Sequence, residues 1–367
     1  MLGVRHINIS EIITQLNKYE PKGIQHEVPI VWERAKDWTV WDKDGKEYID
    51  FTSGIFVANI GHSNDKVRRT ICHQVATEQL HSYIFPTEVR AKLAKKMCEL
   101  TSKDKILFTV TGSEANEAAL QIMQRNKLGA VMSIEGAYYG STSRMRKLND
   151  GCLIEGSLPD KFESLTDISG LFLQAFRGYN VKFMPKDWVQ IWVNWAHEHD
   201  IPVAWDEMQS GFGRTGKMFG YQWYDIEPDL ITCGKAMGAG LPISCVLGSV
   251  KLMSYADDLW STHSGNPVCC AAAIANLEVI EKEHLVERAA NFEKLATPGM
   301  TGHGLMWAID LHDKDYANRV VKWCAEHGLL LLTTNMGTIK IAPPLIIPKT
   351  VFIDGMAILL EGIKECI

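Results

Sequence analysis

The sequence predicts an α/β protein with a mostly parallel sheet and helices on both faces. Short β-rich runs alternate with helical patterns between residues 106 and 232, and such alternation is typical of parallel sheets. The chain of 367 residues is too long for one small core. The character of the sequence changes after Pro267. We therefore expect a large domain over residues 51–270 and a smaller α+β domain formed by residues 1–50 and 271–367.

The first β-rich segment covers residues 31–51, where aromatic residues and Val alternate with polar residues around an Asp44-Gly45 turn. In the expected large domain, helices are predicted at Glu114–Gln124 and Pro185–His199. Five further β-rich runs are predicted as strands: Ile106–Thr111, Ala130–Ile134, Gly170–Phe172, Pro202–Trp205 and Asp229–Thr232.

The region after Pro267 is predicted to contain long helices and two short apolar runs. Apolar residues recur at helical spacing over Ala271–Leu295, which predicts one long amphipathic helix. Two apolar runs, Leu305–Leu311 and Leu329–Thr333, precede a final helix near Ile353–Lys364.

The composition excludes several classes of protein. Apolar residues make up 46% and charged residues 22%, and the net charge is -6, so no basic face for nucleic acid is expected. No apolar run reaches the roughly 18 residues that span a membrane. The nine cysteines include no C-x-x-C pair, so we expect neither a metal site nor a disulfide framework. Scattered thiols suit a reducing, cytoplasmic environment.

The run Thr111-Gly112-Ser113-Glu114 joins a predicted strand to a predicted helix. A helix N-terminus presents unpaired N–H groups and partial positive charge, which suits an anion. Gly112 permits close approach of the backbone, and Ser113 adds a hydroxyl. Ser113 is also explained as a simple N-cap.

Asp206 ends the apolar run Ile201–Trp205. Ligands of open α/β sheets bind at the carboxyl ends of strands, and a buried carboxylate needs a partner. A protonated pyridine nitrogen is one such partner, and a structural carboxylate that caps a helix is the alternative.

Lys235 follows the run Asp229–Gly234 and is surrounded by glycines. Lysine forms Schiff bases with carbonyl cofactors, and burial lowers its pKa. A surface loop lysine is the alternative, but the setting of strand, Gly-Lys and further small residues favours a bulky ligand.

Taken together, these motifs resemble the class III (ω-type) aminotransferases, which are pyridoxal 5'-phosphate (PLP) enzymes of fold type I. The run Asp206–Gly216 resembles the family signature, and Lys235 follows Asp206 at the expected interval. The family's other motifs are matched by Asp50–His62, Thr111–Ala119, Gly136–Gly140 and Ser264–Pro267.

The resemblance implies a role for each matching residue. Lys235 would form the Schiff base with PLP and then move the proton, and Asp206 would pair with the pyridine nitrogen. Gly112 and Ser113 would hold the phosphate, Tyr138 would stack on the ring and Gln209 would contact its 3'-oxygen. Thr262 matches the position that reaches the phosphate of a neighbouring subunit, which implies a homodimer with the active site at the interface.

The sequence departs from the family where substrate is bound. Gln174–Tyr179 replaces a stretch that usually carries glutamates, and Lys340 stands where some members have an arginine. Lysine binds a carboxylate as a point charge and not as a bidentate fork. We list Lys340, Arg177, Phe56 and Phe85 as candidate substrate contacts, although an apolar core also explains the two phenylalanines and a solvated surface also explains Arg177.

We therefore predict an aminotransferase that moves an amino group from an ω-amine or amino acid to an oxo acid. An aminomutase, racemase or decarboxylase on the same scaffold is the first alternative. A PLP-binding protein without turnover is the second.

Overall fold

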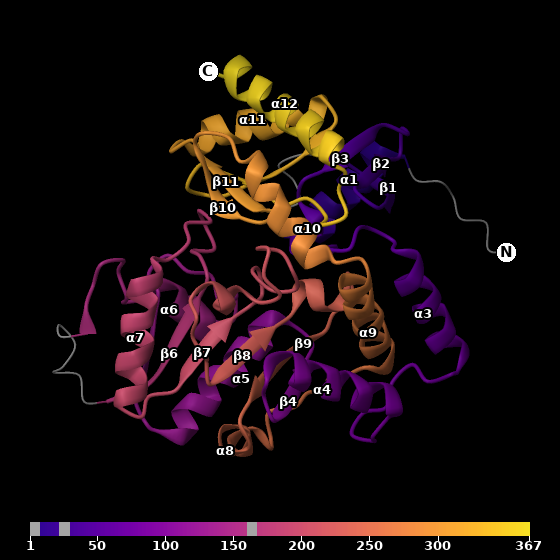
Figure 1. Ribbon diagram of the computed structural model, residues 1–367. Coiled ribbons are helices and arrows are strands. Elements are labelled where there is room, and N and C mark those ends of the chain that lie inside the picture. Colours follow the sequence, from indigo (N-terminus) through magenta and orange to yellow (C-terminus); the bar gives the residue numbers. More distant parts are fainter. Residues whose placement is uncertain (1–7, 22–29, 160–166) are drawn as a thin grey trace.

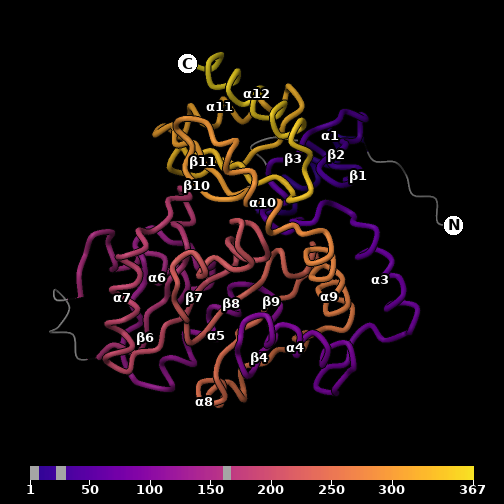
Figure 2. Tube along the Cα trace, in the orientation of Figure 1, coloured from indigo at the N-terminus to yellow at the C-terminus, as the bar shows by residue number. Residues whose placement is uncertain are grey.

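The computed structural model describes residues 8–21, 30–159 and 167–367. These residues form two lobes, a lower one around a six-stranded sheet and an upper one around two four-stranded sheets (Figure 1). Figure 2 shows that the chain starts at the upper lobe, builds the lower lobe and returns to the upper lobe at its C-terminus.

The lower sheet has the strand order β4-β9-β8-β7-β6-β5. The pairs β5–β6, β6–β7 and β7–β8 are parallel, whereas β9 runs antiparallel to both neighbours. The predicted α/β class with a mostly parallel sheet is therefore confirmed, although β9 was not predicted. The strands are β4 (Lys105–Thr109), β5 (Ala130–Ser133), β6 (Ile168–Gln174), β7 (Val203–Asp206), β8 (Leu230–Cys233) and β9 (Ser244–Gly248).

Helices pack against this sheet through apolar faces. In α7 (Lys186–Glu198) the buried residues Trp188, Trp192 and Ala196 recur every four positions and so share one face. Helix α5 (Gly112–Asn126) packs on β6, β8 and β9, and both helices confirm predictions. The remaining elements of this lobe are α3 (Asp65–Ala76), α4 (Glu88–Thr101), α6 (Ser143–Asp150), η3 (Gly220–Trp223), η4 (Lys235–Gly238), α8 (Val250–Met253) and η5 (Ser254–Ala256).

Helix α9 (Pro267–Lys282) is apolar on nearly all sides and is mostly buried. It packs against α3, α4 and η4, beside α3 in the lower lobe (Figure 1). The domain boundary that we placed near residue 270 falls inside this helix.

The prediction of one long helix over Ala271–Leu295 is wrong. Helix α9 ends at Lys282, and the chain continues as α10 (Leu285–Asn291) and η6 (Phe292–Leu295). His284 adopts a left-handed conformation with φ 50°, which a continuous helix of L-residues does not accommodate. Apolar periodicity continues across the break because both helices bury the same kind of face.

The upper lobe joins the two ends of the chain. Strand β12 pairs in parallel with β3, so that Leu329 lies opposite Ile49. The predicted run Leu329–Thr333 is divided at Leu331 between two sheets, because β12 and β13 pair with different strands. One sheet holds β1 (Trp32–Lys36), β2 (Thr39–Asp42), β3 (Glu47–Asp50) and β12 (Leu329–Leu330), and the other holds β10 (Met300–His303), β11 (Met306–Asp310), β13 (Leu332–Thr333) and β14 (Thr338–Ile341).

The other helices of the upper lobe are α1 (Ile9–Tyr19), α2 (Ser53–Phe56), α11 (Lys314–Glu326) and α12 (Lys349–Glu365). Helix α12 confirms the predicted C-terminal helix and extends it by four residues at its start and one at its end. Within the described ranges, every helix is too short or too polar to cross a membrane.

Arg214 ties the two lobes together from a fully buried position. One guanidinium nitrogen donates to the carbonyl oxygens of Leu305 and Pro343, and the other donates to Ser53 Oγ (3.1 Å) and Asn59 Oδ1 (2.6 Å). Because the site is dry, desolvation lowers the pKa of Arg214 to about 9. The charge is thus held by oxygen acceptors from both ends of the chain.

Candidate active site

Two adjacent strands bring an acid and a lysine to the same edge of the sheet. Asp206 is the last residue of β7, and Lys235 comes two residues after the end of β8. Asp206 accepts hydrogen bonds from Met208 N (2.7 Å) and Asn116 Nδ2 (2.8 Å). The carboxyl ends of parallel strands are where ligands bind in open α/β sheets, so this edge is the candidate site.

Burial shifts the pKa of Asp206 and that of Lys235, in each case so that the neutral form is favoured. Desolvation raises the pKa of Asp206 to about 6, and the hydrogen bonds and the charge of Lys235 oppose that shift. Desolvation also lowers the pKa of Lys235, against the attraction of Asp206. Within the described part of the chain, neither group forms an ion pair. A bound ligand with a cationic atom would therefore stabilise the carboxylate.

The N-terminus of α5 faces the same edge. Thr111 and Glu114 form a capping box, in which Thr111 Oγ1 accepts from Glu114 N and Glu114 Oε2 accepts from Thr111 N. No acceptor among the described residues takes the N–H groups of Gly112 and Ser113. These two donors, at the positive end of a fifteen-residue helix, form a site for an anion.

Two glycines keep space around this N-terminus. A Cβ on Gly112 would lie 2.7 Å from the sulfur of Met208, and one on Gly140 would lie 2.4 Å from Ser113 Oγ. Gly140 also has φ 141°, which favours glycine. The absence of a side chain at Gly112 and Gly140 therefore lets Met208 and Ser113 pack closely against the backbone on the two sides of the anion site.

Aromatic and amide side chains form the next layer. Tyr138 lines the cavity, is 38% exposed and contacts Tyr179 edge to face at 6.2 Å. Gly178 lets Tyr138 and Gln209 approach, because a Cβ there would lie 2.8 Å from Tyr138 Cβ and 3.0 Å from Gln209 Nε2.

Lys340 enters the site from β14 of the upper lobe and is 8% exposed. Its ammonium donates to the carbonyl of Gly178 and to Gln209 Oε1 (3.2 Å), and it lies 5.4 Å from the centre of the Phe56 ring. Desolvation, reinforced by the charge of Lys235, lowers the pKa of Lys340 to about 7.

Apart from Glu114 and Asn116, these groups line one cavity of about 490 Å³ between the two lobes. The lower lobe supplies the anion site, the acid and the Schiff-base candidate. The upper lobe supplies Ile55, Phe56, Lys340 and a polar rim formed by Lys314, Asn318, Thr333, Thr334 and Asn335.

The chain matches a family model described as "Aminotransferase class-III" over residues 22–146 and 166–366. This protein is a class III aminotransferase. The match is interrupted at residues 147–165.

The relatives of this chain include both aminotransferases and racemases. The chain is 33% identical over 354 residues to an acetylornithine aminotransferase of Methanothermobacter thermautotrophicus, covering 88% of this chain and 90% of the relative. It is 31% identical over 425 residues to a leucine/methionine racemase of Thermococcus litoralis, covering 97% and 95%. The fold matches the crystal structure of an ornithine aminotransferase from Toxoplasma gondii with a TM-score of 0.89 at 24% identity, covering 98% of this chain and 96% of that one.

The predicted family, fold type I and dependence on PLP are therefore confirmed, and this aminotransferase catalyses PLP-dependent amino transfer. The cavity brings together eight of the eleven candidate site residues. These are Phe56, Gly112, Ser113, Tyr138, Asp206, Gln209, Lys235 and Lys340.

The other three candidates lie outside the cavity of the single aminotransferase chain. Arg177 forms an ion pair with Glu155 at 3.7 Å. Phe85 is 68% exposed in the connection between α3 and α4, and Thr262 is exposed in the connection between η5 and α9.

Sequence reasoning did not identify Asn116, which donates to Asp206, or several residues that line the cavity. Asn116 is buried in α5, where no motif distinguished its side chain from a helix core residue. Lys314 and Asn318 lie on α11, remote in sequence from every motif. Their spacing of four residues on a helix that borders the cavity was the only signal.

Proposed function

We propose that the cavity between the lobes holds PLP with its aldehyde on Lys235 and its ring nitrogen on Asp206. The enzyme then moves an amino group from an ω-amine or amino acid to an oxo acid. The observation that carries this proposal is the buried carboxylate of Asp206 beside the partly buried Lys235 at adjacent strand ends, where neither forms an ion pair within the described residues. A carboxylate with its pKa raised to about 6 is stabilised by a cationic pyridine nitrogen.

The remaining residues fit the cofactor. The free N–H groups of Gly112 and Ser113 would bind the phosphate, Tyr138 would cover one ring face and Gln209 would meet the 3'-oxygen. When bound, PLP supplies an aldehyde and an electron-withdrawing ring that stabilises negative charge at the carbon bearing the amine.

Lys235 would move the proton in this reaction. Because burial lowers its pKa, Nζ of Lys235 gives up its own proton more readily than an exposed lysine does and then accepts the proton from the amine-bearing carbon. Asp206, buried and held by two hydrogen bonds, keeps the ring nitrogen protonated and oriented.

Substrate contacts are proposed at the upper lobe. Lys340 would bind a carboxylate close to the reacting carbon, and Phe56 would pack on the carbon chain. Arg177 would have to leave Glu155 to reach substrate, so its proposed role depends on movement of that ion pair.

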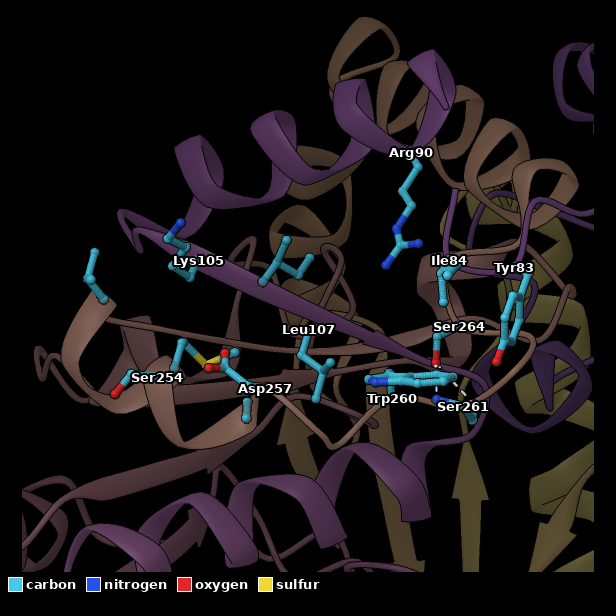
Figure 3. Close-up of a pocket in the computed structure, with 14 residues that line it drawn as sticks. Tyr83, Ile84, Arg90, Lys105, Leu107, Ser254, Asp257, Trp260, Ser261 and Ser264 are labelled. Atoms are coloured by element: carbon cyan, nitrogen blue, oxygen red, sulfur yellow. Dashed lines mark hydrogen bonds between the residues drawn. The ribbon is translucent and has the colours of Figure 1, made fainter. Parts of the chain in front are cut away.

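A homodimer is proposed from the exposed groups near Thr262. Figure 3 shows a second pocket, in which Arg90 of α4 points toward Trp260 and Ser264. Tyr83, Ile84 and Trp260 line this pocket. Together with Leu80 and Phe85 they form an exposed apolar patch whose side chains are 40–68% exposed. Tyr83 meets Trp260 edge to face at 5.6 Å. Patches of this kind are typical of protein interfaces.

Burial of this patch against a second copy would carry Thr262 toward the phosphate of the partner's cofactor. Phe85 would then contact substrate in the partner's cavity rather than its own. We also propose a cytoplasmic location, which the nine free cysteines support.

Racemisation is the second candidate reaction. The racemase of Thermococcus litoralis covers nearly the whole chain, so the same scaffold is used for that chemistry. A racemase leaves the cofactor in its aldehyde form, whereas an aminotransferase converts it to the amine form and needs an oxo acid to restore it.

The test is a half-reaction on the purified holoenzyme. A panel of amines, each without oxo acid, should abolish the visible absorbance of the lysine-linked cofactor, and added oxo acid should restore it. Lys235→Ala should lack this absorbance from the start, while Lys349→Ala, an exposed lysine on α12, should retain it. Inversion of an amino acid without any loss of absorbance would favour the racemase.

A further inference from the structure

A single amide nitrogen inside α5 links two parts of the cofactor site. Asn116 Nδ2 donates to Asp206 Oδ2 at 2.8 Å and to the carbonyl oxygen of Tyr139 at 2.7 Å. Asn116 is 1% exposed and does not line the cavity. It can therefore influence a ligand in the cavity only through the groups that it holds.

The orientation of this amide is fixed by its surroundings. Both groups that Nδ2 contacts are oxygen acceptors, so a flipped amide would place Oδ1 against two oxygens. In the observed orientation Oδ1 is buried and accepts no hydrogen bond from any described residue. A buried polar atom without a partner destabilises a fold. Packing alone therefore does not explain an asparagine at position 116, whereas the two hydrogen bonds from its nitrogen do.

Asp206 depends on this donor at one of its two oxygens. Met208 N donates to Oδ1 at 2.7 Å, and Asn116 donates to Oδ2. Among the described residues, Asn116 is the only one that donates to Asp206 from a side chain, so a substitution can remove this bond. Hydrogen bonds to a carboxylate stabilise its charged form, and both bonds lower the pKa of Asp206 against the effect of burial.

The same helix carries the anion site. Gly112 and Ser113 precede Asn116 by four and three residues, so the three residues lie on one face of α5. Tyr139 lies in the segment that would cover the cofactor ring. Asn116 therefore joins the helix that would hold the phosphate, the segment that would cover the ring and the acid that would meet the ring nitrogen.

We propose that Asn116 is a positioning residue for the reaction, which acts through Asp206 by keeping its carboxylate ionised and oriented toward the ring nitrogen of the cofactor. The inference rests on the proposed function, because it requires Asp206 to pair with that nitrogen. Without the bond from Asn116, the desolvated carboxylate has lost one of two donors and takes the proton of the ring nitrogen more readily. An unprotonated ring withdraws electrons less strongly, so reaction at the amine-bearing carbon slows.

The experiment measures where this proton lies in the holoenzyme. PLP labelled at its ring nitrogen with the heavy isotope of nitrogen is bound at saturating concentration, and the NMR signal of that nitrogen at neutral pH distinguishes the protonated ring from the unprotonated ring. Asp206→Asn supplies the unprotonated reference. We expect the ratio of protonated to unprotonated ring to fall about tenfold in both Asn116→Ala and Asn116→Leu, as for loss of a hydrogen bond to a charged group.

Asn149 offers a matched control, because it holds the same segment without contacting Asp206. Its Oδ1 accepts from Tyr139 N at 2.6 Å, and its Nδ2 donates to the carbonyl oxygen of Gly140 at 3.0 Å. Asn149→Ala should loosen this segment and leave the proton on the ring nitrogen. The rate at which a donor amine abolishes the cofactor absorbance should fall about tenfold in the two Asn116 variants. Circular dichroism confirms folding, and if one of the two variants fails to fold, the other decides.

Contrary outcomes separate this inference from the proposed function. If the Asn116 variants keep the ring signal of the wild type, or if Asn149→Ala shifts that signal as far as they do, the role of Asn116 is overturned while the pairing of Asp206 with the cofactor stands. If Asp206→Asn itself leaves the ring signal of the wild type unchanged, the proposed function fails and the role of Asn116 fails with it.

Discussion

Lys340 is a buried cation whose hydrogen-bond acceptors are both neutral. Gly178 O and Gln209 Oε1 accept from it, and Lys235 is a second cation close by. A carboxylate brought against Lys340 therefore gains a charge partner that the protein itself does not supply. This explains why a lysine is tolerated at a site where desolvation would otherwise favour its neutral form.

The charge of Lys340 should make substrate capture depend on pH. Its pKa is lowered to about 7, so the ammonium is present below that pH and is lost above it. For a donor with a carboxylate next to the amine-bearing carbon, kcat/KM relative to pentylamine should fall about tenfold between about pH 6 and pH 8. Lys340→Arg, which stays charged, should flatten the profile. A wild-type ratio that is constant over this range would contradict the role of Lys340.

At the scale of elements, the break between α9 and α10 is a local conformational choice. Glu283 ends α9 with an ordinary φ of -95°, and His284 takes the left-handed conformation with φ 50°. A non-glycine residue is destabilised there by about 1–2 kcal/mol. The break redirects α10, which then contributes Arg288 to carbonyl groups of residues 345–347.

Glycine at the break should stabilise the protein. We expect His284→Gly to raise the free energy of unfolding by about 1 kcal/mol, because glycine adopts positive φ without a steric penalty. Glu283→Gly, one residue earlier, should lower it by about 0.4–1 kcal/mol, because residue 283 has a negative φ that any L-residue adopts and glycine adds conformational freedom to the unfolded chain. Denaturant unfolding of both variants measures the difference. Equal destabilisation by both glycines would mean that His284 is not strained.

Helices and strands that are determined by their own residues could be predicted from the sequence. Features that are determined by packing against distant segments could not. The strands β7 and β8 and the strand before α5 were predicted from apolar runs that end at a polar residue or a glycine. These runs also predicted that Asp206, Lys235 and Gly112 lie at the carboxyl ends of strands. The break at His284 leaves the apolar periodicity intact, so only the packing of α10 reveals it. The division at Leu331 likewise depends on which strands β12 and β13 pair with.

The contacts of the outer cavity depend on the whole molecule. Lys314 and Asn318 face the cavity because α11 packs over β13 and β14, and no local pattern encodes that placement. For the same reason Phe85 and Arg177 were candidates on residue type alone, and the single chain places neither in the cavity.

Assembly is the prediction at the scale of the molecule. If the patch of Leu80, Tyr83, Ile84, Phe85 and Trp260 is the dimer face, Ile84→Glu combined with Phe85→Glu should weaken dimerisation by roughly a hundredfold or more. Sedimentation velocity over a dilution series measures this change. Ile191→Glu on α7, which is 42% exposed on the opposite side of the lower lobe (Figure 1), should leave assembly unaltered. Unchanged dimers in the double variant would exclude this face.

Arg214 constrains how substrates can enter. Its hydrogen bonds fasten the segment that carries Gln209 to Pro343, three residues beyond Lys340. These bonds hold the two lobes together at the floor of the cavity. A hinge motion that opened the lobes there would leave the buried guanidinium of Arg214 without its hydrogen-bond acceptors. Substrates and products must therefore pass through the opening of the cavity that α11 borders. A change of substrate specificity during evolution would then occur by replacement of side chains at this opening.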